Sequence, residues 1–159
     1  MIGDRIESRE ELVKVLADEF ESCMEESYPV VDLTAQTVTQ VIDSAYAEPD
    51  ANEHLDGHEI VAFDPLTSRE SYRIMEKFAW SRPEEQSRRL LDAISQRHPF
   101  RMFDGAVNRM GIADEWHEWR HETIRNHAAD LLEAYGVEFK DGEIVCNNKK
   151  NIRTYLCDD

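Results

Sequence analysis

The chain has 159 residues, of which 41% are hydrophobic and 33% charged. This is enough apolar material for one core, so we predict a single domain over residues 1–159 and exclude a chain that is disordered throughout. The 34 acidic and 18 basic residues give a formal net charge of −16, which disfavours binding to nucleic acids and to anionic membranes. This charge fits a basic protein partner, but we favour simple solubility as its explanation, because an acidic balance bears on solubility first.

No segment approaches the roughly 18 consecutive apolar residues that span a membrane. The first five residues, Met1 to Arg5, contain neither a basic leader nor an apolar stretch, so we expect no export. The three cysteines, Cys23, Cys146 and Cys157, are an odd number without C-x-x-C spacing. This pattern is typical of reduced thiols rather than of a disulfide or zinc framework, and we therefore predict a cytoplasmic protein.

The first third of the chain predicts one helix followed by strands. Ser8 and Glu11 have the spacing of a capping box, and apolar residues recur at helical intervals from there to Tyr28. Those apolar residues are Leu12, Val13, Val15, Leu16, Phe20, Cys23 and Met24. The β-branched segments 30–33 and 37–42 predict a hairpin. Residues 47–58 are polar and include a proline and a glycine, which predicts a mobile loop before a strand at residues 60–63.

The middle of the chain predicts four helices. Thr67 and Glu70 form a second capping box, which opens a helix with Tyr72, Met75, Phe78 and Ala79 on one face. Pro83 and Pro99 each stand where a first helical turn tolerates proline, and Gly111 is placed to end the helix that begins at Pro99. The longest helix follows Asp114 and ends at Gly136. Its apolar stripe consists of Trp116, Trp119, Ile124, Ala128, Leu131, Leu132 and Tyr135.

The last part of the chain has the strongest hairpin signal. Residues 137–140 and 143–146 flank Asp141-Gly142, a pair that tolerates the positive φ angles of a type I′ turn. We expect residues 147–159 to form a loose tail in which residues 152–156 add an edge strand. Because strands are grouped early and late with helices between them, we predict an α+β fold, mainly helical, with a small antiparallel sheet.

One motif suggests metal chemistry. His117-Glu118-Trp119-Arg120-His121 matches H-E-x-x-H, in which two histidines one turn apart bind zinc and the glutamate acts as general base. His127 has the spacing of a third ligand, but the glycine that would turn the chain back is here Ile124. On a continuous helix His121 and His127 would be about 9 Å apart along the axis and about 120° apart around it. We therefore predict no metal, no cofactor and no catalytic residue, with a zinc-dependent hydrolase as the alternative.

The chain resembles the uncharacterised protein family 0158 of bacteria over residues 28 to 140. The resemblance rests on Val31-Asp32-Leu33-Thr34, Ser68 to Phe78, Phe100-Arg101-Met102-Phe103-Asp104, and the tryptophan helix from Trp116 to Val137. It implies a bacterial cytoplasmic α+β protein and assigns no activity. Ala35 stands where the family's early turn would have glycine. His117 stands at a tyrosine-like position, which weakens the zinc interpretation.

If the family shares a site, its polar groups would be Arg101 and Asp104 beside the aromatic core, facing Trp116 and Arg120. We favour a structural salt bridge or helix cap for these residues, because buried charges usually occur in pairs; a cleft at this place would make the four residues a binding site. Our leading functional prediction is a non-catalytic binding or regulatory protein whose acidic surface meets another protein.

Overall fold

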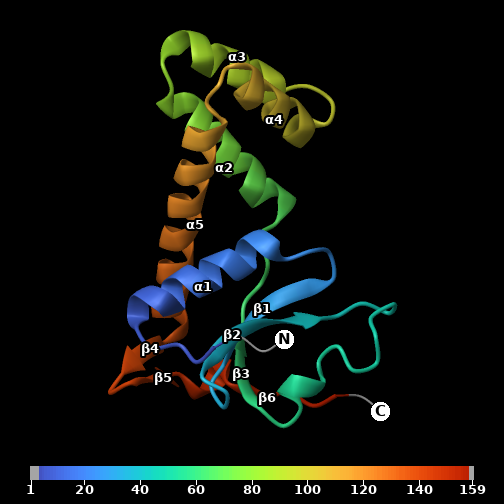
Figure 1. The fold of residues 1–159 in the computed structure, drawn as a ribbon, viewed down its shortest axis with the longest axis vertical. Helices are drawn as coiled ribbons and strands as arrows, with labels where there is room; N and C mark the ends of the chain where they lie inside the picture. The colour runs from blue at the N-terminus through green and yellow to red at the C-terminus, as the bar shows by residue number, and fades with distance from the viewer. Residues whose placement is uncertain (1–3, 158–159) are drawn as a thin grey trace. The chain divides into compact units, whose positions relative to one another are not determined.

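The computed structural model describes residues 4–157, and 51% of the structure is helical. The elements in chain order are α1 (Arg9–Ser22), β1 (Ser27–Asp32), β2 (Thr37–Ile42), η1 (Glu53–Leu55), β3 (Glu59–Ala62), α2 (Ser68–Ser81), α3 (Glu84–Ile94), α4 (Pro99–Arg109), α5 (Ala113–Tyr135), β4 (Val137–Lys140), β5 (Glu143–Cys146), η2 (Lys149–Asn151) and β6 (Arg153–Thr154) (Figure 1). The predicted class, a mainly helical α+β fold with a small antiparallel sheet, is confirmed. None of the helices in this part of the chain is long and apolar enough to cross a membrane.

The chain divides into two units, which we describe separately. The mixed unit contains Met1–Pro65 and Ile124–Asp159, and the helical unit contains Leu66–Thr123. Helix α5 begins in the helical unit and ends in the mixed unit. The prediction of one domain over the whole chain stays a prediction.

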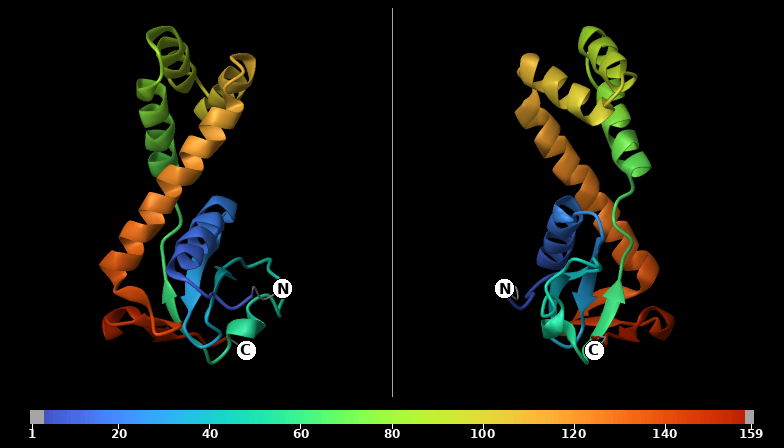
Figure 2. Two further views of the ribbon diagram at one scale, coloured as in Figure 1. Left: turned by 60° about the vertical axis from the view of Figure 1, so that its left-hand side comes forward. Right: turned by 90° about the vertical axis from the view of Figure 1, so that its right-hand side faces the viewer.

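The mixed unit is built on a four-stranded antiparallel sheet with the strand order β2-β1-β3-β6. Helix α1 packs against β1 and β2 (Figure 2). Phe63, directly after β3, contacts Phe20 of α1 and Tyr135 of α5, with ring centroids 6.4 and 4.8 Å apart. A second cluster consists of Val30, Val41, Leu55 and Ile60. The predicted hairpin of residues 30–42 is therefore present, and β3 adds to it beside β1.

The segment 47–58 contains η1 and a buried anchor. Leu55 is completely buried in the second cluster, and Asn52 bonds to both backbone groups of Ile42. This loop therefore contributes to the core, and its mobility stays a prediction.

The prediction that the first helix continues to Tyr28 is wrong. Helix α1 ends at Ser22, and Met24, predicted on the buried face, is 80% exposed. Cys23 leaves the helical conformation, and the Ser27 hydroxyl bonds to both the N–H and the C=O of Met24. This turn starts β1 at the position where a further helical turn would lie.

The capping and turn signals are confirmed where hydrogen bonds test them. Thr67 and Glu70 form a complete capping box, whereas for Ser8 the structure gives the bond from the Glu11 N–H to its hydroxyl. Asp141 and Gly142 have φ angles of 53° and 79°. The hairpin they close has the predicted register from Val137↔Cys146 to Lys140↔Glu143, and the predicted edge strand is present as β6, paired with β3.

The helical unit has a core of its own, made by α2, α3, α4 and the start of α5. Its buried residues are Met75, Phe78, Ala79, Leu90, Ala93, Ile94, Phe103, Ala106, Val107, Ile112 and Trp116. Gly111 has a φ of 69° between α4 and α5, as expected for a glycine that ends a helix.

Candidate functional site

The H-E-x-x-H motif lies on an uninterrupted part of α5. His117, Glu118 and His121 are exposed, and His127 packs against the ring of Phe20 with centroids 5.4 Å apart. Among residues 4–157, no group of three His, Cys, Asp or Glu side chains could hold a metal ion. A catalytic zinc needs three protein ligands, so the described residues do not fit such an ion.

The four predicted site residues differ in exposure. Arg101 and Asp104 are exposed on α4, Arg120 is partly buried, and Trp116 is only 6% exposed. The Trp116 ring lies 4.8 Å from that of Phe103, between centroids, so it is part of the core of the helical unit. A binding site formed by these four residues stays a prediction.

Sequence reasoning did not identify Arg82, the cation that lies over an aromatic ring in the core of the helical unit. The Arg82 guanidinium is 5.4 Å from the centroid of Phe78 and forms an ion pair with Glu115. The spacing of four residues between Phe78 and Arg82 is a signal that could have identified it, because such residues share a helix face.

A buried carboxylate joins the β1–β2 turn to the loop before β3. Asp32 is 1% exposed; its Oδ1 accepts hydrogen bonds from the N–H groups of Thr34 and Ala35, and its Oδ2 lies 2.8 Å from Nδ1 of His58. Burial lowers the pKa of the neighbouring His54, and the charge of Asp32 opposes that shift. The carboxylate oxygens are used for connections within the mixed unit, so we assign Asp32 a structural role.

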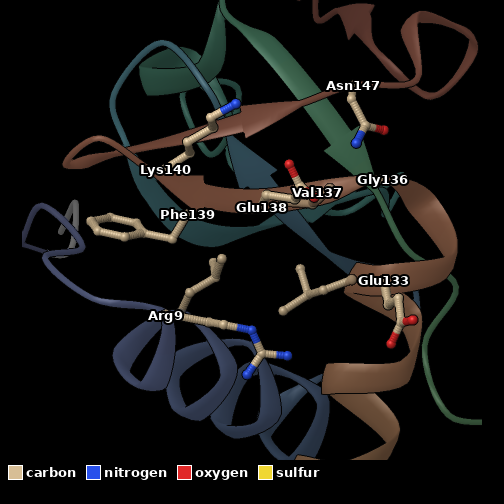
Figure 3. Close-up of a pocket in the computed structure, with 10 residues that line it drawn as sticks. Arg9, Glu133, Gly136, Val137, Glu138, Phe139, Lys140 and Asn147 are labelled. Atoms are coloured by element: carbon tan, nitrogen blue, oxygen red, sulfur yellow. The ribbon is translucent and has the colours of Figure 1, made fainter.

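A cavity of about 630 Å³ lies on one side of α1, bounded by the end of α5 and by β4. Its apolar lining comes from Leu12, Leu132, Val137 and Phe139. Figure 3 shows the Arg9 guanidinium reaching from α1 toward the end of α5, while the charged ends of Glu138 and Lys140 point away from α1. The polar groups therefore do not converge on one point, and the cavity does not define a ligand class.

A second hollow, of about 640 Å³, lies between α1 and β2; we refer to it as the α1–β2 groove. Apolar side chains from three segments, Ile6, Val15 and Val38, contribute to its lining. Four carboxylates also line it, on Asp4, Glu10, Glu11 and Glu19. Its one cation, Lys14, lies 3.7 Å from Asp18 in an exposed i, i+4 pair. The lining of the groove therefore combines apolar side chains with a net negative charge.

The net charge of the whole chain resides in the mixed unit. Met1–Pro65 and Ile124–Asp159 contain 24 acidic and 8 basic residues, whereas Leu66–Thr123 contains ten of each. The mixed unit thus carries −16 and the helical unit carries no net charge. The composition of the whole chain gives only the total charge, so this division could be recognised only from the two units of the structure.

No curated protein matches the chain, and no protein of solved structure matches it either. A family model does match, over residues 12–152, and its description is "Uncharacterised protein family (UPF0158)". These residues include β1 to β5 and the whole of α2 to α5. The chain therefore belongs to this family.

Proposed function

We propose that this protein is a non-catalytic, cytoplasmic binding protein that meets a basic protein partner through its mixed unit. The observation that carries the proposal is the α1–β2 groove, whose lining combines four carboxylates with apolar side chains. Protein interfaces combine an apolar centre with a polar rim, and this groove offers both in one place.

The charge division between the units supports the same partner. A surface of one sign attracts a partner of opposite sign over several ångströms and raises its rate of association. Because the excess of carboxylates lies in the mixed unit, a basic protein would be drawn to this unit rather than to the helical unit.

Matched charge variants of the full chain test the proposal. Glu10→Gln, Glu11→Gln and Glu19→Gln together remove three negative charges from the α1–β2 groove. The control set Glu84→Gln, Glu118→Gln and Glu122→Gln removes three from exposed positions of the helical unit. Each protein is immobilised, exposed to lysate of its own host and coupled with a carbodiimide, which joins carboxylates directly to lysines.

We expect the wild type and the control set to capture the same lysine-rich protein, with coupled carboxylates at Glu10, Glu11 or Glu19. The groove set should capture much less of it, and capture by the wild type should weaken as salt increases because the interaction is between exposed charges. Equal capture by both variant sets, or coupling only within residues 66–123, would contradict the proposal.

A further inference from the structure

Helix α2 presents a row of cations on the side that faces away from the core of the helical unit. Arg69, Arg73 and Lys77 follow one another at four-residue steps, and all three are exposed. At about 100° per residue they lie within about 80° of one another around the helix axis, while the buried Phe78 lies about 180° from Arg69. We refer to these three residues as the α2 cation row.

The exposed Trp80 lies at the carboxyl-terminal end of this row. It is about 20° from Arg69 around the helix axis, and it is 69% exposed. Tryptophan and arginine are over-represented among the residues that contribute most to the affinity of protein interfaces. This side of α2 therefore combines charge with one large apolar side chain that a partner would remove from water.

Helix α5 carries a matching row of carboxylates within the same unit. Asp114, Glu118 and Glu122 also follow one another at four-residue steps, and all three are exposed. The buried Trp116 is about 200° around the helix axis from both Asp114 and Glu118, so this row also faces away from the core. Glu118 is the glutamate of the H-E-x-x-H motif, for which residues 4–157 provide no metal site. We refer to these three residues as the α5 carboxylate row.

The two rows do not pair within one chain. Among residues 4–157, no ion pair or hydrogen bond involves the side chain of any residue of either row. The two helices meet through their buried sides, where the ring centroids of Phe78 and Trp116 are 5.2 Å apart. The rows lie on the other sides of the helices, so they face away from each other and each needs a partner from outside the chain.

The distribution of charge favours a second copy of this chain as that partner. Two mixed units, at −16 each, repel one another, whereas the helical unit carries no net charge. Glu70 and Glu76 are partly buried beside the cation row, where they would repel a uniform polyanion such as a nucleic acid. A second copy instead offers separate carboxylates at the same four-residue spacing as the cations.

We infer that a second copy of this chain covers the α2 cation row with its α5 carboxylate row, and that Trp80 is buried at this contact. Rows at four-residue steps form the ridges that interlock in the commonest class of helix packing, in which the helix axes cross at about −50°. The inference is independent of the proposed function.

The contact is heterologous, because the two rows of one copy face away from each other. Helix α2 of one copy contacts α5 of the next, and each bound copy still presents one row that has no partner. Such contacts either continue into longer assemblies or close into a ring. We therefore expect the mass of the assembly to increase with protein concentration.

Sedimentation of the full-length protein tests whether copies associate. Exposed ion pairs each contribute little to affinity, so we expect a weak contact that forms between about 10 µM and about 1 mM protein. The weight-average mass should rise above that of a single chain over this range. A mass that stays at one chain up to about 1 mM would overturn the inference.

Reversal of the charges tests the pairing itself. Arg73→Glu with Lys77→Glu makes the α2 row acidic, and Glu118→Lys with Glu122→Lys makes the α5 row basic. We expect each of these double variants to remain a single chain, and a mixture of the two to associate. A chain with all four changes should associate like the wild type, because its net charge is the same and its rows are again opposite in sign. Failure of that chain to associate would contradict pairing of the two rows.

The contribution of Trp80 is tested by a second pair of variants. We expect Trp80→Ala to raise the Kd of association about tenfold or more, as loss of a central interface tryptophan does. Tyr46→Ala is the control, since Tyr46 is 96% exposed and lies in the mixed unit, and it should leave the Kd unchanged. Both positions are exposed, so these variants decide the question if a charge-reversed variant does not fold. The same Kd for both would show that Trp80 is not buried between copies.

The charge variants of the proposed function separate the two proposals. The control set Glu84→Gln, Glu118→Gln and Glu122→Gln removes two carboxylates of the α5 row, so it should lose self-association and still capture the basic partner. The groove set should lose the partner and still associate. Self-association that persists in the control set and is lost in the groove set would overturn this contact.

Discussion

At the residue scale, one buried amide connects parts of the mixed unit that are distant in sequence. The Gln36 side chain donates to the C=O of Leu33 and of Ile144, and its Oε1 accepts the Ile144 N–H at 2.6 Å. The backbone C=O of Gln36 accepts a hydrogen bond from the backbone N–H of Ile6. Gln36 therefore replaces a neighbouring strand for β5, since it satisfies both backbone groups of Ile144.

We predict that Gln36→Ala lowers the free energy of unfolding by about 3 kcal/mol, because buried groups of Ile144 lose their partners. Gln40→Ala is the matched control, since Gln40 bonds only to side chains at a more exposed position, and we expect it to cost about 1 kcal/mol or less. Urea unfolding measures both. Similar losses for the two variants would show that Gln36 does not hold β5.

At the element scale, the junction between α5 and β4 depends on a glycine. Gly136 has a φ of 76°, and a Cβ built there would lie 2.3 Å from Oδ1 of Asn147. The Asn147 N–H also donates to the Gly136 C=O at 2.8 Å. A side chain at position 136 would therefore have to displace the Asn147 side chain from the place where the hairpin returns against the helix.

We predict that Gly136→Ala destabilises the protein more than Gly142→Ala. Both positions have positive φ, which costs an alanine about 1 kcal/mol, but Gly142 has open space around it. The close approach to Asn147 adds a second cost at position 136. The double variant Gly136→Ala with Asn147→Ala should recover the free energy of unfolding that is lost through this close approach, as measured by urea unfolding. Equal effects of the two single glycine variants would contradict the close approach.

At the scale of the whole molecule, charge is divided unequally along the chain. The mixed unit carries 24 acidic and 8 basic residues, while the helical unit is balanced. Repulsion among like charges destabilises a folded unit, and dissolved salt screens it. The excess charge that we propose attracts a partner therefore also has a cost for the stability of the free protein.

We predict that the melting temperature rises when NaCl increases from about 0.01 M to about 0.15 M, because the screening length falls from about 30 Å to about 8 Å. Differential scanning calorimetry measures the shift. The groove set Glu10→Gln, Glu11→Gln and Glu19→Gln should reduce the salt dependence more than the control set in the helical unit. A melting temperature that falls with salt would contradict net repulsion in the mixed unit.

The sequence by itself determined most of the elements, because their signals are local. The capping box of Thr67 and Glu70, the Asp141-Gly142 turn and the end of α5 at Gly136 depend on residues within a few positions of one another. The end of α1 could not be predicted in this way, since apolar spacing continues through Met24 while the Ser27 turn already starts β1.

Only the tertiary structure decided what the elements form together. The placement of β3 beside β1, the bonds of Gln36 to Ile144 and the cap of Asn52 on Ile42 join residues that no local pattern relates. The α1–β2 groove belongs to the same class. Composition counted the carboxylates, but folding determined which of them share a surface, because that depends on contacts between segments distant in sequence.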